Sequence, residues 1–175
     1  MKSGEVDDFE KNYGYKPMPM RAAVDALAVF VHKDNPIKCL SLAQVDAIFS
    51  KTRKRGLEQP GSSAVVQSVA TDKYAIGYSG VGYKTADVRS VPIAADNGGE
   101  CFDASAENAY EGQYAIARFL YIYMNKKPGN PLDPLRGEFV KYVLSKQGQE
   151  AVVKDGYYPI PSAVANQDLA TFDLK

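Results

Sequence analysis

The chain has 175 residues, a length typical of one domain or of two small lobes. It contains 21 lysine and arginine residues and 21 aspartate and glutamate residues, so its formal net charge is zero. No excess of positive charge favours nucleic acid or an anionic membrane as a partner. The hydrophobic content of 45% is ordinary for a globular fold and is sufficient for a sizeable core.

Two features of the sequence bear on the cellular compartment. The first residues, Met1–Glu5, are polar and lack the apolar core of a signal peptide, and no apolar run is long enough for a membrane span. We therefore expect neither an export signal nor an anchor in this sequence.

The two cysteines, Cys39 and Cys101, do not have a zinc-binding spacing. They can form one disulfide in an oxidising compartment, but their sequence separation leaves the pairing open.

The first half of the chain alternates helical and strand-like segments. The apolar, β-prone run Val24–His32 is typical of a buried strand. Ser41 and Gln44 have the spacing of a capping box, which predicts an amphipathic helix over Ser41–Ser50. The basic run Lys51–Gly56 is typical of a solvated helix end, with a nucleic-acid or targeting patch as the alternative. In chain order we predict a helix at 5–13, a strand at 24–32, helices at 41–50 and from 61 onward, and strands at 74–79 and 88–94.

The second half continues the alternation. We predict a helical turn at 105–110, a strand at 118–125, and helices at 135–145 and 147–155. Gly156 is placed to stop the last helix. The tail from Tyr157 contains two prolines and is predicted to be extended. In the helix at 135–145, Leu135, Phe139, Tyr142 and Val143 lie on one apolar side. Strands alternating with helices predict an α/β fold with a mixed sheet flanked by helices.

The sequence offers few parts for catalysis. His32 is the only histidine, and its place at the end of a predicted strand favours a surface role over a catalytic one. The acidic residues do not have the spacing of a metal-binding loop, and a single histidine is too few for a typical zinc site. The glycines of Gly80-Val81-Gly82 are followed by Thr85, where a dinucleotide fingerprint requires a third glycine. We therefore predict no enzyme, no metal and no cofactor.

One segment is a candidate for binding an anion. Gly61-Ser62-Ser63 stands at the start of a predicted helix, where free backbone N–H groups and the positive end of the helix dipole attract oxyanions. The two hydroxyl groups can add hydrogen bonds. The alternative interpretation is that a serine caps the helix, which is a common role of serine at this position.

Four ordered segments resemble the phosphate-binding proteins of phosphate ABC transporters, which are periplasmic binding proteins. The segment Val24–Gly56 is similar to a family strand that ends in a K-D-N-P turn and leads into a helix. The segment Gly61–Thr85 is similar to the next helix of the family and to its A-I-G-Y strand. Its long returning strand is similar to Ala117–Gly129. Its C-terminal helix pair, with an S-x-x-G-Q junction and a D-G-Y-x-P close, is similar to Pro134–Pro161.

The resemblance implies a fold of two α/β lobes joined by crossing strands. It implies that residues 1–23 are a remnant leading in from the first lobe or hinge, 24–125 are the second lobe with its crossing strands, and 126–175 are C-terminal helices and tail of the first lobe. It also implies a periplasmic location, inorganic phosphate or a similar oxyanion as ligand, and a transporter permease as partner.

Three family segments that carry ligand residues are not evident in this sequence. They are an N-terminal G-S-S/T loop, a serine–aspartate or serine–arginine segment, and an arginine followed by S-G-T. The resemblance places the last of these in several dozen residues between the positions of Gly56 and Leu57. Gly61-Ser62-Ser63 is similar to the first only in composition, so no family ligand residue is assigned to this chain.

The missing first-lobe strands have a physical consequence. The apolar faces of the helices from Leu135 to Asp155 need another cover, which predicts self-association as a homo-oligomer or marginal stability. A structural or interaction module that self-associates without binding a ligand is therefore the alternative to a phosphate-binding transport component.

Overall fold

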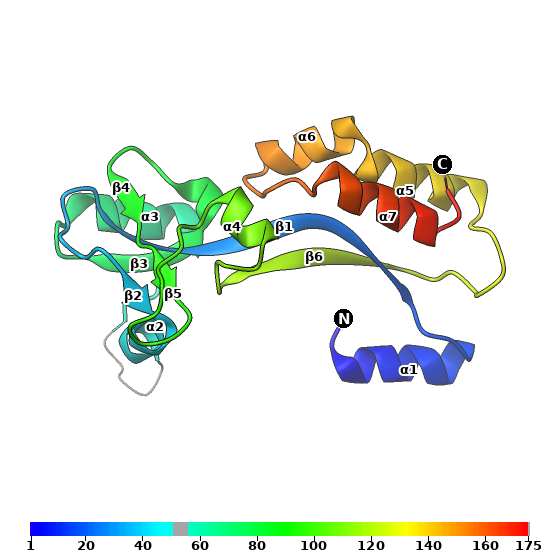
Figure 1. Cartoon of the computed structure of the whole chain (residues 1–175), viewed down its shortest axis with the longest axis horizontal. Coiled ribbons are helices and arrows are strands. Elements are labelled where there is room, and N and C mark those ends of the chain that lie inside the picture. Colours follow the sequence, from blue (N-terminus) through cyan, green and yellow to red (C-terminus); the bar gives the residue numbers. More distant parts are fainter. Residues whose placement is uncertain (51–55, 175) are drawn as a thin grey trace. The chain divides into compact units, whose positions relative to one another are not determined.

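The strand β1 (Met18–His32) organises the sheet in the computed structural model, which describes residues 1–50 and 56–174. It pairs antiparallel with β3 (Ile76–Gly80) and with β4 (Val88–Ser90), and β6 (Ala117–Met124) also pairs with it (Figure 1). The short strands β2 (Leu40–Ser41) and β5 (Ile93–Ala94) form a separate parallel pair. The sequence-based prediction of an α/β fold with a mixed sheet is confirmed.

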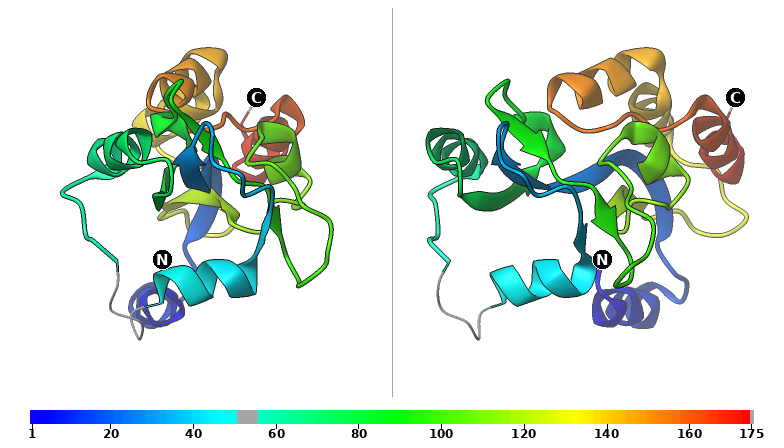
Figure 2. Two further views of the ribbon diagram at one scale, coloured as in Figure 1. Left: turned by 90° about the vertical axis from the view of Figure 1, so that its left-hand side faces the viewer. Right: turned by 60° about the vertical axis from the view of Figure 1, so that its left-hand side comes forward.

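Seven α-helices and one 3₁₀ turn accompany these strands in the described part of the chain (Figure 2). They are α1 (Ser3–Tyr13), α2 (Leu42–Phe49), α3 (Ser62–Thr71), the 3₁₀ turn Val81–Tyr83, α4 (Ala106–Tyr110), α5 (Pro134–Leu144), α6 (Lys146–Lys154) and α7 (Ser162–Thr171). The predicted capping box of α2 is confirmed, because the Ser41 hydroxyl accepts a hydrogen bond from the Gln44 N–H. The Gln44 side chain in turn accepts one from the Ser41 N–H at 2.8 Å.

Two predicted elements differ in the structure. The predicted extended tail is wrong beyond Pro161, because α7 begins at Ser162 and Pro161 stands at its N-cap with a φ of −58°, which suits the start of a helix. The strand predicted at 88–94 is divided into β4 and β5, with Pro92 between them. Proline has no N–H to donate to a strand partner, so it interrupts the ladder. The predicted helix end at Lys51–Gly56 lies outside the described residues, except for Gly56.

The chain divides into two units, each with its own core. One unit comprises residues 24–118 and 155–158. Its core combines both faces of β1 with α3, β4 and β5, and Phe30, Val66 and Ile93 are almost completely buried. Tyr114 is also buried, and its hydroxyl donates to the Leu27 carbonyl at 2.9 Å. Burial raises the pKa of Tyr114, so this donor stays protonated at neutral pH.

A close backbone approach in the same unit depends on two glycines. A Cβ atom on Gly82 would lie 2.4 Å from the backbone of Gly156. Gly156 has a φ of 85°, in the left-handed region that glycine adopts readily. It follows α6 as predicted, and Tyr158 then forms an antiparallel bridge with Val24. The glycine pair therefore allows this segment to reach the sheet.

The other unit comprises residues 1–23, 119–154 and 159–175. Its core contains Met20, Met124, Val140 and Phe172, contributed by β1, β6 and the C-terminal helices. Gln149 of α6 links these elements through hydrogen bonds. Its amide donates to the Ala22 carbonyl, and its side-chain oxygen accepts from the Ile160 N–H.

The buried face of α5 is not the predicted one. Gly137, Val140 and Leu144 are buried, whereas Leu135, Phe139 and Tyr142 are 81%, 46% and 54% exposed. The exposed three are spaced i, i+4 and i+7, so they form one stripe along the helix. We call Leu135, Phe139 and Tyr142 the α5 stripe.

A disulfide joins Cys39, just before β2, to Cys101, just after the turn that follows β5. The linked Cα atoms are 6.2 Å apart, and 62 residues separate the cysteines in sequence. Next to the disulfide, Ile93 of β5 pairs with both Leu40 and Phe102. The cross-link therefore closes a long loop at a point where backbone pairing already brings the two segments together.

Removing the disulfide is expected to destabilise the chain by about 2–4 kcal/mol, because the unfolded state regains the entropy of a long closed loop. The measurement is urea unfolding of the double variant Cys39→Ser/Cys101→Ser beside the unaltered chain. Dithiothreitol should lower the midpoint of the unaltered chain towards that of the variant and leave the variant unchanged. An unaltered chain whose midpoint is insensitive to the reductant would contradict this expectation.

A buried ion pair ties β1 to α7. Asp168 is 6% exposed and accepts hydrogen bonds from the backbone N–H and the guanidinium of Arg21. The same guanidinium donates to Gln167 and lies 5.8 Å from the centre of the Phe119 ring. Hydrogen bonding to Asp168 raises the pKa of Arg21, so the guanidinium remains charged.

The substitution Asp168→Ala is expected to lower the free energy of unfolding by about 3 kcal/mol, because it leaves the Arg21 charge and backbone N–H without their acceptor. Asp8→Ala is the matched control. Asp8 forms an exposed pair with Lys11, and its loss should cost less than about 0.5 kcal/mol. Equal effects in chemical denaturation would show that the Arg21–Asp168 pair does not stabilise the fold.

Candidate functional site

The segment Gly61-Ser62-Ser63 lies at the start of α3, as predicted, but neither serine is its cap. Gly61 is the N-cap and has no side chain to donate or accept a hydrogen bond, so the capping interpretation is wrong. Ser62 and Ser63 occupy the first turn of α3. The N–H groups of a first helical turn have no partner within the helix, so they are free to meet an acceptor.

The strand β3 sets the position of α3. Side chains alternate along this strand, so Gly77 and Ser79 are buried while Tyr78 is exposed. A Cβ atom on Gly77 would lie 2.7 Å from Val65 and 2.9 Å from Val69, both on α3. The absence of a side chain at Gly77 thus allows the helix to approach the strand.

A cavity of about 490 Å³ opens at the start of α3. Gly61 and Ser62 line it, but Ser63 does not. Ser79 also lines the cavity, and its hydroxyl donates to the Ser62 carbonyl at 3.4 Å. The other lining residues come from the segment before α3, from α3 and β3, and from β1 and α2: Leu27, Phe49, Leu57, Glu58, Gln59, Val65, Ser68, Gly77, Tyr78 and Gly80.

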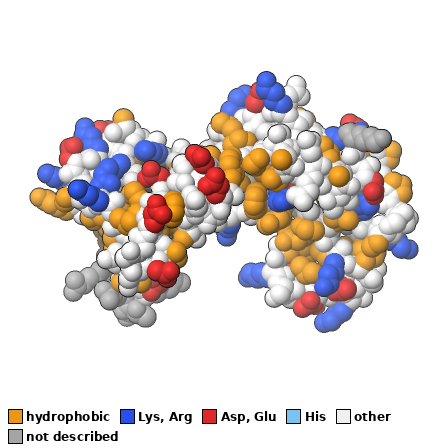
Figure 3. Space-filling model, viewed as in Figure 1, with side chains coloured by type: hydrophobic (Ala, Val, Ile, Leu, Met, Phe, Trp, Pro, Cys, Tyr) orange, Lys and Arg blue, Asp and Glu red, His pale blue; other side chains and the backbone are white. Residues whose placement is uncertain are grey.

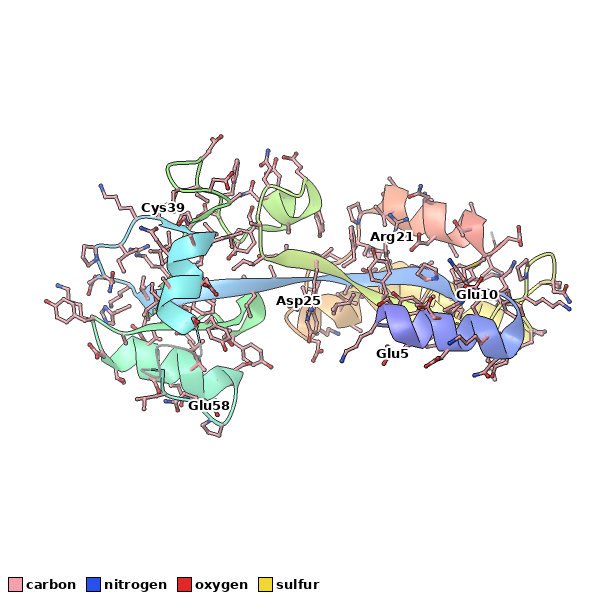
Figure 4. All side chains as sticks on the ribbon, turned by 90° about the horizontal axis from the view of Figure 1, so that it is seen from below. Glu5, Glu10, Arg21, Asp25, Cys39 and Glu58 are labelled. Atoms are coloured by element: carbon pink, nitrogen blue, oxygen red, sulfur yellow. A yellow bond between two sulfur atoms is a disulfide. The ribbon has the colours of Figure 1, made fainter. Side chains whose placement is uncertain are left out.

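Among these described residues, the cavity lining has one charged side chain, Glu58, which is exposed (Figure 4). The positive end of α3 attracts an anion, whereas the Glu58 carboxylate repels one. The hydroxyl groups of Ser62 and Ser68 can donate to an oxyanion, whereas that of Ser79 already donates to the Ser62 carbonyl. The arrangement can therefore hold a small oxyanion through hydrogen bonds and the helix dipole, with Glu58 acting against it.

An apolar hollow of about 420 Å³ adjoins this cavity and shares Leu27, Phe49 and Tyr78 with it. Phe49 and Tyr78 meet edge to face, with ring centroids 4.9 Å apart. Sequence reasoning identified the start of α3 but missed Glu58, Tyr78 and Ser79 as lining residues. The alternation of small and large residues in Ile76–Gly80 was the one signal that could have placed Ser79 towards α3.

The remaining candidates have structural roles. His32 ends β1, and its Nδ1 atom accepts a hydrogen bond from the Asp34 N–H at 3.1 Å.

No group of three or more metal-ligating side chains occurs among residues 1–50 and 56–174. No helix in the described part of the chain has the length and apolarity to span a membrane. On the face in Figure 3, acidic, basic and apolar side chains are interspersed.

Comparisons with known proteins give a consistent picture of ancestry. A family model described as a PBP superfamily domain matches residues 51–147. The phosphate-binding protein PstS of Pseudomonas aeruginosa is 43% identical over 225 residues, covering 99% of this chain and 70% of that protein. Because the alignment spans 225 residues and this chain has 175, about 50 residues of the relative within the aligned region have no counterpart here.

Solved structures share the fold. A possible phosphate binding protein from Planctomyces limnophilus superposes with a TM-score of 0.72 at 21% identity, covering 97% of this chain and 77% of that one. An ABC-type phosphate transport receptor from Vibrio cholerae superposes with a TM-score of 0.63 at 17% identity, covering 83% and 73%. By its sequence match over nearly the whole length, the chain belongs to the PstS family of phosphate-binding proteins, within the PBP superfamily.

Proposed function

We propose that this chain is a phosphate-binding component of a phosphate ABC transporter and that it delivers phosphate to the transporter permease. The observation that carries the proposal is the 43% identity to the P. aeruginosa phosphate-binding protein over 99% of the chain. In this proposal the chain binds its ligand without transforming it and is not an enzyme. It uses no cofactor, because a helix start and hydroxyl groups are sufficient to hold an oxyanion.

The disulfide supports a location outside the cytoplasm. Disulfides form and persist in oxidising compartments such as the bacterial periplasm, and they are rare where thiols are kept reduced. The Cys39–Cys101 disulfide would therefore stay oxidised in a transport component located in the periplasm. This location agrees with the proposed delivery of phosphate to a membrane permease.

We place phosphate at the cavity that begins at α3. The ligand oxygens would accept hydrogen bonds from first-turn N–H groups of α3 and from the Ser62 hydroxyl, near the positive end of the helix. Since the described lining has no lysine or arginine, and Glu58 adds a negative charge, we expect weak binding. The binding free energy of a phosphate dianion is less favourable here than beside an arginine, because arginine forms strong charge-assisted hydrogen bonds.

The substitution Glu58→Gln is expected to strengthen phosphate binding about fivefold, because it removes a like charge worth about 1 kcal/mol near the ligand. Ser62→Ala should weaken binding by a similar factor, because it removes a hydroxyl donor. Isothermal titration calorimetry at low ionic strength measures both effects. Glu111→Gln is the matched control, since Glu111 is exposed and does not line the cavity.

Either of two outcomes would contradict this part of the proposal. One is the absence of both binding heat and any rise in melting temperature at phosphate concentrations of tens of millimolar, since a ligand that binds the folded state must stabilise it. The other is phosphate binding that Glu58→Gln and Ser62→Ala both leave unchanged, which would place the ligand elsewhere on the chain.

A second candidate function is that of an interaction module that self-associates, and the α5 stripe favours it. Leu135, Phe139 and Tyr142 present a continuous apolar face to solvent while the opposite face of α5 is buried. Exposed apolar stripes of this kind mark contact surfaces for other proteins. A second copy of the chain is the partner in this proposal, because two identical stripes can pack against each other about a two-fold axis.

The double variant Leu135→Lys/Phe139→Glu is expected to weaken self-association at least tenfold, because it places charges in the contact. Analytical ultracentrifugation over a range of protein concentrations measures the effect. Tyr74→Glu is the control, because Tyr74 is 78% exposed and lies in the other unit. A chain that stays monomeric at the highest concentrations, with or without the substitutions, would exclude this function.

A further inference from the structure

The loop between β6 and α5, residues 125–133, encloses a second cavity, of about 250 Å³ (the loop is yellow-green to yellow in Figure 1). All of its lining residues belong to the unit that contains residues 1–23 and 119–154, whereas the cavity at α3 belongs to the other unit. The lining is mostly polar and consists of Tyr15, Asn125, Lys126, Lys127, Asn130, Pro131, Leu132, Asp133 and Arg136.

A lysine with a buried side chain contributes to this lining. The Lys126 side chain is only 4% exposed, although a lysine is rarely buried without a specific partner. Its Nζ atom donates to Asp173 at 3.0 Å, and Asp173 is itself 76% exposed. An ammonium group has three N–H donors, and Asp173 is its acceptor among the described residues. Lys126 therefore retains N–H donors beyond the one that contacts Asp173.

The walls of the cavity are held in place by side-chain contacts. The Arg136 guanidinium donates to the Asp133 carboxylate and to the Asn125 carbonyl. The Tyr15 hydroxyl donates to the Asn125 side chain at 2.7 Å. Asn130 closes a turn by donating its N–H to the Lys127 carbonyl. A site whose groups are already positioned loses less entropy when a ligand binds.

The turn itself has a specific chemical basis. Pro128 and Gly129 occupy its two central positions, and Gly129 has a φ of 77°. This is the pattern of a type II turn, which requires a positive φ at its third residue. The turn holds Lys127 and Asn130 close together at the cavity.

The charge of the lining favours an anion. Lys126, Lys127 and Arg136 are positive, and Asp133 is the one acidic lining residue among those described; Asp173, outside the lining, pairs with Lys126, so the charge of Lys127 is left in excess. The Arg136 backbone N–H and guanidinium lower the pKa of Asp133, so it remains ionised and neutralises one of these charges. Asp133 also occupies the start of α5 as its N-cap. The attraction for an anion therefore comes from side-chain cations and not from the end of this helix.

We propose that this cavity, the 125–133 site, binds a small oxyanion, which is either a carboxylate or a phosphate. Lys126 and Lys127 would provide ammonium donors, and Asn130 an amide donor, to the same group of oxygens. Carboxylates and phosphates share the negative charge and closely spaced acceptor oxygens that such a set of donors recognises. The site is independent of phosphate binding at α3.

Nuclear magnetic resonance of the whole chain, labelled with ¹⁵N, can test the proposal at low ionic strength, where screening is small. Inorganic phosphate, sulfate and acetate are titrated separately. We expect saturable shifts in the backbone signals of Lys127 and Asn130 and in the side-chain amides of Asn125 and Asn130. Shifts with acetate identify the carboxylate class, and shifts with phosphate and sulfate alone identify the tetrahedral oxyanions.

The substitution Lys127→Gln is expected to weaken anion binding, as followed by these signals, about two- to fivefold, because it removes one exposed cation. Lys84→Gln is the matched control, since Lys84 is also exposed but lies in the other unit. Lys126→Met should weaken binding further, and unchanged signals from the buried Val140 and Phe172 would show that this variant remains folded. Weaker binding in both lysine variants, but not in the control, supports the site.

The proposal is overturned if none of the three anions shifts these signals, or if Lys127→Gln binds as tightly as the unaltered chain. Shifts at Gly61 and Ser62 report on the cavity at α3 in the same titration. Failure of either anion site can therefore be recognised without reference to the other.

Discussion

The pairing of β1 with three other strands is the constraint on which the rest of the structure depends. This fifteen-residue strand contributes to both cores, with Met20 in one and Ala26, Ala28, Val29, Phe30 and Val31 in the other. The register of β3 is set by its hydrogen bonds to β1, so that Phe30 lies opposite Gly77. Because α3 packs where Gly77 has no side chain, this register also sets where the cavity at α3 opens.

The described lining of that cavity has few charged groups. The relative from P. aeruginosa has about 50 residues in the aligned region that are absent here, since its alignment spans 225 residues against 175 in this chain. The resemblance places an arginine and an S-G-T loop in such a segment. The described lining of the cavity at α3 has a helix start, hydroxyl groups and the opposing Glu58 carboxylate.

The two proposed anion sites use different physical means. At α3 the attraction comes from backbone N–H groups and the helix dipole, an effect that decays within the first turn. At the 125–133 site it comes from side-chain cations, one of which is almost fully buried. Buried charges are screened by salt much less than exposed ones. The contribution of Lys126 should therefore persist at ionic strengths that suppress the contribution of the exposed Lys127.

The sequence by itself determined the features that depend on near neighbours: the buried strand at 24–32, the capping box of Ser41, the helix start at Gly61 and the family. Only the tertiary structure decided the Cys39–Cys101 pairing, the buried face of α5, and the meeting of Lys126 with Asp173. Periodicity shows that a helix has an apolar face, but it does not show which face another element covers. These features join residues far apart in the chain, and their geometry exists only after the strands and helices have packed.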